Sequence, residues 1–231
     1  MAVYLFFGFV GPFTARYLSE ILGLVGGEIE GATISLPPPK PVDGLSQFSS
    51  NASQLCLLVA VVVAASALAM DAKPEMAIFL RTRVAEVRKL LWPRYVISAA
   101  AIAGSFLLGA LTAWYESAAL IGSLPAAGVL AGITYGVIYL FFVVAVVAGA
   151  ASRATSVVGT VLISIFVLLL MPIVGLIDTV ADWLPSNLAS ALTAIPDGAS
   201  AGQYWKATVI SVLASAVAFW LASRWTAARE L

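Results

Sequence analysis

Long apolar runs separated by short polar segments dominate this chain, and their lengths predict membrane spans. A helix that crosses the hydrocarbon core of a bilayer needs about 20 mostly apolar residues. Six runs approach or reach that length, which predicts an all-α fold: a polytopic membrane protein with six transmembrane helices in one domain over residues 1–231. The expected spans are approximately 1–25, 55–70, 95–114, 126–150, 156–177 and 207–223.

The first run is interrupted early. Pro12 breaks it, and Arg16 and Glu20 follow four residues apart, a spacing typical of a charge pair at a membrane boundary. We expect the outer half of a first span whose beginning is shortened or lies outside this sequence. The next segment, residues 26–54, is rich in Pro, Gly and Ser, so we expect a polar loop there.

A basic segment, Asp71–Arg94, separates the second and third spans and holds half of the Lys and Arg residues. Its apolar positions recur at helical spacing, which predicts an amphipathic helix from about Glu75 to Leu91. Such a helix between two spans is expected to lie along the membrane surface, where it binds lipid or presents a face to a soluble partner. The apolar face consists of Met76, Phe79, Leu80, Val84, Val87 and Leu91.

Small and kinking residues refine the last three spans. Gly128, Gly132 and Gly136 repeat every four residues in the fourth span, which predicts a face that another helix approaches closely. Pro172 predicts a kink in the fifth span. Residues 178–206 contain two short, weakly apolar pieces that are too short to cross, so we expect re-entrant or surface-lying helices between spans five and six.

The distribution of basic residues predicts the orientation. Loops that face the cytoplasm carry an excess of Lys and Arg. The loops after spans two and four, with the C-terminal tail, hold nine, whereas the other side holds Arg16, Lys40 and Lys206. We therefore expect a multi-pass protein of a bacterial inner (plasma) membrane, with a cytoplasmic C-terminus. The nine are Lys73, Arg81, Arg83, Arg88, Lys89, Arg94, Arg153, Arg224 and Arg229.

Composition narrows the possible functions. Of the 231 residues, 61% are hydrophobic and only 10% are charged, against about 25% charged in soluble domains. The sequence has no His and a single Cys, Cys56, so it offers no imidazole metal site and no intrachain disulfide. It has no GxxxxGK[ST] phosphate loop. Acid–base or metal chemistry is poorly supplied, so we expect neither an enzyme nor a cofactor on this chain.

Four stretches together resemble the permease subunits of type-2 ABC transporters, which are mostly bacterial exporters. They are GPFTARYLSEIL at Gly11–Leu22, ISLPPPKPVDGLSQFSSNASQL at Ile34–Leu55, LLWPRY at Leu90–Tyr95 and the broken region Trp183–Gly198. The chain departs from the family in the basic segment. Lys73-Pro74-Glu75 stands where Gly-Thr is usual, and Arg83-Val84-Ala85-Glu86 replaces a Pro-[Val/Ile]-Ser-Arg turn. The family's interfacial helix before the first span has no counterpart in this sequence.

The resemblance implies specific partners. Such a permease pairs with a second six-span subunit, identical or homologous, and the pair binds two cytoplasmic ATPase subunits that carry ATP and Mg. The movement of the ATPases passes through the segment between spans two and three. No nucleic-acid partner is expected. The residues expected to reach the ATPase are Arg81, Arg83, Glu86, Arg88 and Lys89, although topology and contact with anionic lipid also explain the basic ones.

We therefore expect the permease half of an ATP-driven exporter for an amphipathic, lipid-like or drug-like substrate. An ion-coupled secondary transporter is one alternative, but spans two to six have almost no charge at their centres. A non-transporting assembly subunit, which needs no special residues, is another. A cavity between two permeases, lined by spans two and five, would suit the substrate. Its residues stay open: Ser66, Ser164, Tyr135 and Tyr139 are polar candidates, and helix packing also explains each of them.

Overall fold

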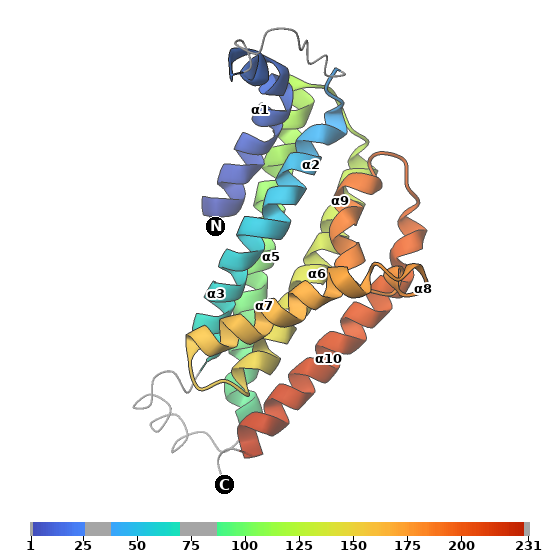
Figure 1. Cartoon of the computed structure of the whole chain (residues 1–231). Coiled ribbons are helices and arrows are strands. Elements are labelled where there is room, and N and C mark those ends of the chain that lie inside the picture. Colours follow the sequence, from blue (N-terminus) through green and yellow to red (C-terminus); the bar gives the residue numbers. More distant parts are fainter. Residues whose placement is uncertain (1, 26–37, 70–86, 229–231) are drawn as a thin grey trace.

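The computed structural model describes residues 2–25, 38–69 and 87–228 (Figure 1). All regular structure in these three ranges is helical. The predicted all-α fold is therefore confirmed for the described part of the chain. Residues 71–86 of the basic segment lie outside it, and residues 87–94 form the first turns of a longer helix, so the predicted amphipathic helix remains a prediction.

Five described helical segments are long and apolar enough to cross a membrane, as in a multi-pass membrane protein. The first predicted span is represented by α1 (Ala2–Val25), whose apolar part, Ala2–Leu18, is shorter than the other five. Six spans therefore remain a prediction, and five of them are long and apolar enough to cross a membrane. These five are Pro41–Leu68, Leu91–Leu120, Ala126–Ala151, Val157–Val174 and Ala201–Thr226.

The second span begins much earlier than expected. Helix α2 (Pro41–Asn51) continues through one π-helical turn, η1 (Ala52–Cys56), into α3 (Leu57–Leu68). The predicted polar loop over 26–54 is therefore wrong from Pro41 onward. The chain is helical there despite its polar composition because tertiary packing outweighs local preference.

Two features start and anchor α2. The Lys40 amide donates a hydrogen bond to the Asp43 carboxylate at 2.7 Å, which satisfies one of the free amides of the helix start. Pro41 occupies the first turn, where its fixed φ suits a helix. Leu45 and Phe48 are fully buried in the main core. Because this apolar face is buried, the opposite face of α2 is free to carry serines.

The third span is also longer than predicted. Helix α5 (Val87–Leu120) extends beyond the expected 95–114 at both ends, and the expected loop at 115–125 shrinks to residues 121–125. Ala113 and Ser117 are fully buried in its last turns, so packing keeps this part helical. Figure 1 shows α1, the α2–α3 helix and α5 running side by side.

Helix α6 (Ala126–Ala151) lies at the centre, and α3, α5, α7, α9 and α10 all pack against it. Its bounds confirm the predicted span 126–150. The consecutive residues Val143, Val144 and Ala145 point to different sides of the helix and are all buried, as expected for a helix that neighbours surround.

The glycines of α6 confirm the predicted close approach. A Cβ atom at Gly132 would lie 2.6 Å from the Leu192 Cα, and one at Gly128 would lie 3.2 Å from the Pro196 Cα. At Gly136 a Cβ would meet the ring of Phe106 from α5. Two of the three glycines therefore receive the backbone of residues 191–196, and the third receives an aromatic side chain.

The fifth span, α7 (Val157–Val174), lies within the predicted 156–177, and Pro172 sits in its last turn. The sixth span forms part of α10 (Trp205–Ala228). Between them the predicted short pieces are present as helices. They are α8 (Asp178–Ala181), the 3₁₀ helix η3 (Pro185–Ser190), α9 (Ala191–Ala194) and the 3₁₀ helix η4 (Ala201–Tyr204).

These short helices form a second buried cluster against α6. Leu188, Ala191 and Tyr204 are almost completely buried in it. The Tyr135 hydroxyl donates a hydrogen bond to the Ala201 carbonyl at 2.9 Å, and its ring lies 5.3 Å from the ring of Tyr204. The region is therefore a packed layer on α6 and not an irregular loop.

Gly132→Ala is expected to lower the free energy of unfolding by about 1–3 kcal/mol, the usual cost of forcing an extra methyl group into a packed site. The added Cβ would meet backbone at Leu192, which cannot move aside alone. Unfolding of the purified protein in detergent by chemical denaturant measures the change.

Gly149→Ala is the matched control, because Gly149 lies in the same helix and a Cβ there would have no neighbour within 4 Å among the described atoms. It is expected to leave stability unchanged or raise it by about 0.5–1 kcal/mol through helix propensity. Equal losses in the two variants would contradict the proposed packing.

Candidate functional site

A cleft of about 910 Å³ opens between the α2–α3 helix and α7, with the short helices at one end and α6 behind it. The lining comes from four parts of the chain that are distant in sequence. The α2–α3 helix contributes Ser46, Ser49, Ser50, Ser53, Gln54, Leu57, Leu58 and Val61, and α6 contributes Tyr139. Helix α7 contributes Ile165, Leu168, Leu169 and Pro172, and Gly175 follows it. The region 181–193 contributes Ala181, Leu184, Ser186, Asn187, Ala189, Ser190 and Thr193.

The α2–α3 wall is one face of a continuous helix. Its lining residues recur every three or four positions from Ser46 to Val61, the spacing that places side chains on the same side of a helix. Leu45 and Phe48, on the other side, anchor the helix in the core. The same helix therefore provides both a core face and a cleft face.

The cleft is polar at one end and apolar at the other. The polar part of the α2–α3 wall, Ser46 to Gln54, belongs to α2 and η1. Helix α2 packs against α9, where Thr193 supplies another hydroxyl to the cleft. The apolar part, Leu57 to Val61, belongs to α3, which packs against α7. Asp, Glu, Lys and Arg are absent from the described lining. The described walls thus form an uncharged amphipathic site.

The hydroxyls of the α2–α3 wall differ in their hydrogen bonding from those elsewhere in the spans. Ser105, Ser164 and Ser211 each donate to the carbonyl four residues earlier, which is usual for Ser in apolar helices. Within the described ranges, by contrast, the structure records no hydrogen bond from the side chains of Ser46, Ser49, Ser50, Ser53 and Gln54. Their polar groups are therefore available to a ligand or to water.

The π-helical turn η1 lies where the polar part of this wall meets the apolar part. Ser53 and Gln54 lie inside the turn, and Leu57 follows it directly. A π turn adds one residue relative to an α-helix, and such turns are frequent at functional sites.

A small cavity of about 30 Å³ adjoins the cleft, and Tyr139 lines both spaces. The Tyr4 hydroxyl is buried at this cavity and has no hydrogen-bond partner among the described residues. The volume is sufficient to hold a water molecule. Ser49 and Ser53 line both spaces, so the polar lining continues inward from the cleft.

The four polar candidates from the sequence have different surroundings. Ser66 donates to the Val63 carbonyl at 2.8 Å and Ser164 to the Thr160 carbonyl at 2.7 Å, so both bond to their own helix. Tyr135 joins α6 to the short helices. Tyr139 lines the cleft. Packing therefore explains three of them, and the fourth belongs to the site.

The expected coupling residues lie mostly beyond what the structure describes. Arg81, Arg83 and Glu86 fall in 70–86, and Arg88 is in the first turn of α5 with its side chain outside the description. Lys89 is described and exposed, at the start of α5. The predicted contact of these five residues with an ATPase stays a prediction.

The serine face of the cleft was missed from the sequence because residues 26–54 were assigned to a loop. The signal is the spacing of Ser46, Ser49, Ser50 and Ser53, which continues into the leucines of the second span. Interpreting that spacing as helical extends the second span and predicts a serine face on it.

Among the described residues, no group of three or more His, Cys, Asp or Glu is arranged to bind a metal.

Ser53→Cys is expected to react with a small water-soluble thiol reagent at least about tenfold faster than the wild-type chain. Ser53 is exposed in the cleft, whereas the natural Cys56 is fully buried, so the wild type provides the background rate. Quantitative labelling of the protein in membranes, read by mass spectrometry, measures the ratio.

Val63→Cys is the control, since Val63 is 49% exposed on the same helix but lies outside the cleft. In a bilayer that side contacts lipid, so slow labelling is expected. Equal rates at positions 53 and 63 would show that water does not enter the cleft selectively.

Comparisons of the chain with models of known protein families, with curated proteins and with solved structures give no match.

Proposed function

We propose that this chain is the permease subunit of an ATP-driven ABC exporter for an amphipathic substrate. A second permease, identical or homologous, and two cytoplasmic ATPase subunits complete the transporter. The single observation that carries the proposal is the uncharged amphipathic cleft between the second span and α7. A cavity lined by spans two and five, between two permeases, is also where an amphipathic substrate is expected.

The chemistry of the cleft favours a substrate with an uncharged polar head and an apolar body. Unpaired hydroxyl and amide groups on the α2–η1 wall can exchange hydrogen bonds with water for hydrogen bonds with a head group. Leucines of α3 and α7 can bury a chain or ring system, at about 25 cal/mol per Å² of apolar surface. A charged head would find no opposite charge among the described lining residues.

If the proposal holds, ATP must be hydrolysed by another chain. The sequence has no phosphate loop, and its basic segment lies between the second and third spans, on the side where an ATPase would bind. A secondary transporter usually places ionisable groups near its substrate. The neutral lining favours the ATP-driven function over that alternative.

Affinity purification through a C-terminal tag, from native membranes in mild detergent, is expected to recover a soluble ATPase that carries a phosphate loop. The Arg83→Ala, Glu86→Ala double variant is expected to recover several-fold less of it, because both residues belong to the proposed contact. Lys40→Ala, on the side assigned to the exterior, should not change recovery. Recovery of the chain alone, including with ATP trapped by vanadate, would contradict the proposal and favour a secondary transporter or an assembly subunit.

Leu58→Trp is expected to weaken binding of a fluorescent alkyl glucoside, a probe with an uncharged head, by at least about tenfold. Leu58 lines the apolar part of the cleft, and an indole there would occupy the space of the alkyl chain. Val63→Trp adds the same ring to the same helix outside the cleft and should bind the probe normally. Titration followed by fluorescence anisotropy compares the two. Equal affinities of the Leu58→Trp and Val63→Trp variants would show that the probe does not bind in the cleft.

A further inference from the structure

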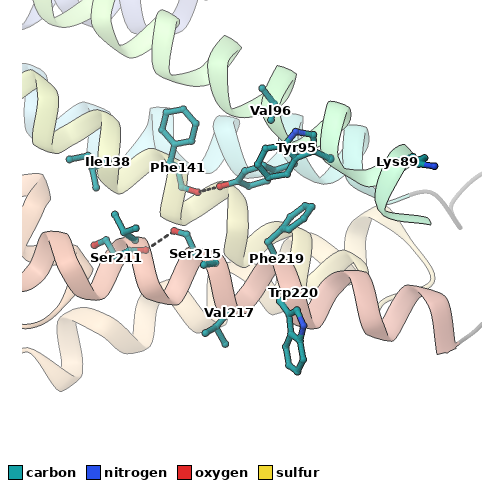
Figure 2. A pocket seen from close by; sticks show the side chains of 13 residues that line it. Lys89, Tyr95, Val96, Ile138, Phe141, Ser211, Ser215, Val217, Phe219 and Trp220 are labelled. Carbon is teal, nitrogen blue, oxygen red and sulfur yellow. Dashed lines mark hydrogen bonds between the residues drawn. The ribbon is translucent and has the colours of Figure 1, made fainter. Parts of the chain in front are cut away.

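A second large hollow lies on another side of α6. It is a groove of about 1180 Å³ between the first turns of α5 and residues 211–220 of α10, and Ile138 and Phe141 of α6 form part of its lining (Figure 2). It shares no lining residue with the cleft. Its volume exceeds the roughly 300–1,000 Å³ typical of sites for drug-sized ligands.

The body of the groove is apolar because its hydroxyls are already bonded to backbone. Ser211 donates to the Ala207 carbonyl at 2.7 Å, and Ser215 donates to the Ser211 carbonyl at 2.6 Å. The Tyr95 hydroxyl donates to the Phe141 carbonyl at 3.1 Å (Figure 2). These groups leave the walls suited to a hydrocarbon chain, in contrast to the free hydroxyls of the cleft.

Basic side chains lie at the start of α5 and near the end of α10. Lys89 lines the groove at the start of α5, and the Arg224 guanidinium carbon lies 4.8 Å from the centre of the Trp220 ring, which lines it from α10. Among the described lining residues there is no Asp or Glu. Lys89 therefore lies on this apolar space, and Arg224 lies beside it against a ring that lines it, so the two basic side chains suit an anionic head group joined to a hydrocarbon.

Aromatic side chains mark this part of the groove as the level of a membrane interface. Trp92 and Trp220 are 55% and 47% exposed, although both are large apolar residues. The Phe219 ring of α10 lies 5.2 Å from the Trp92 ring and 5.3 Å from the Tyr95 ring, and these contacts join α10 to α5 at the groove. Exposed Trp is typical of the interface between hydrocarbon and head groups.

We propose that this groove binds an anionic phospholipid of the surrounding membrane. The acyl chains lie along α10 over Phe141 and Val217, and the phosphate lies near Lys89 and Arg224. The lipid then links the beginning of α5 to the end of α10. This inference does not depend on the proposed transport function, because it concerns a different surface.

Brominated lipids quench tryptophan fluorescence at short range and so report binding at the groove. The test uses a full-length variant that keeps only Trp220, with the other five tryptophans replaced by Phe, in phosphatidylcholine vesicles. One fifth of the lipid is either brominated phosphatidylglycerol or brominated phosphatidylcholine. We expect the anionic lipid to associate at least about fivefold more strongly. Lys89→Gln should reduce that preference about fivefold, the contribution of one basic residue near anionic lipid.

Lys40→Gln removes the same charge outside the groove and should leave the preference unchanged. Equal quenching by both lipids would overturn the proposal, since the groove would then hold neutral lipid. Absence of quenching would also overturn it, since protein, such as a second copy, would then cover the groove. Native mass spectrometry of the wild-type chain and of Lys89→Gln provides a second measurement that does not need the Trp replacements. We expect fewer retained phosphatidylglycerol molecules on the variant, and equal numbers would overturn the proposal.

Discussion

The contact between the glycine face of α6 and the backbone of residues 191–196 determines much of the remaining structure. Because Gly128 and Gly132 lack side chains, the short helices can approach α6 at backbone distance. That approach buries Leu188 and Ala191 and brings Thr193 to the cleft, facing the serine wall of α2. A larger side chain on α6 would move the whole layer outward. The polar end of the cleft therefore depends on two glycines that do not line it.

The two hollows beside α6 use serine in opposite ways. In the groove, Ser211 and Ser215 donate to their own helix, which makes the wall effectively apolar. In the cleft, Ser49 and Ser53 lie on α2 and η1 and make no such bond among the described residues. The same residue type thus supports hydrocarbon binding in one place and hydrogen bonding in the other. The difference lies in backbone bonding, which composition does not reveal.

The sequence predicted well wherever apolar character alone decides the structure. The fourth and fifth spans have almost uninterrupted apolar runs, and their bounds agree closely with α6 and α7. The glycine spacing in α6 also predicted a close approach correctly. The prediction failed at Pro41–Gln54 and at 115–120, where helices carry polar residues. Leu45 in the first segment and Ser117 in the second are fully buried against other helices, and a local sequence pattern contains no such information.

The free hydroxyls also indicate how a substrate could gain affinity at the cleft. A hydroxyl left unpaired in an apolar environment costs about 1–3 kcal/mol, so several on one wall are tolerable only where water reaches them. The polar end of the cleft must then be hydrated before a ligand arrives. A head group that replaces this water exchanges one set of hydrogen bonds for another and gains little free energy. Most affinity would come from the leucines of α3 and α7, whereas the hydroxyls would select the kind of head group. Affinity and selectivity would thus reside at opposite ends of the same cleft.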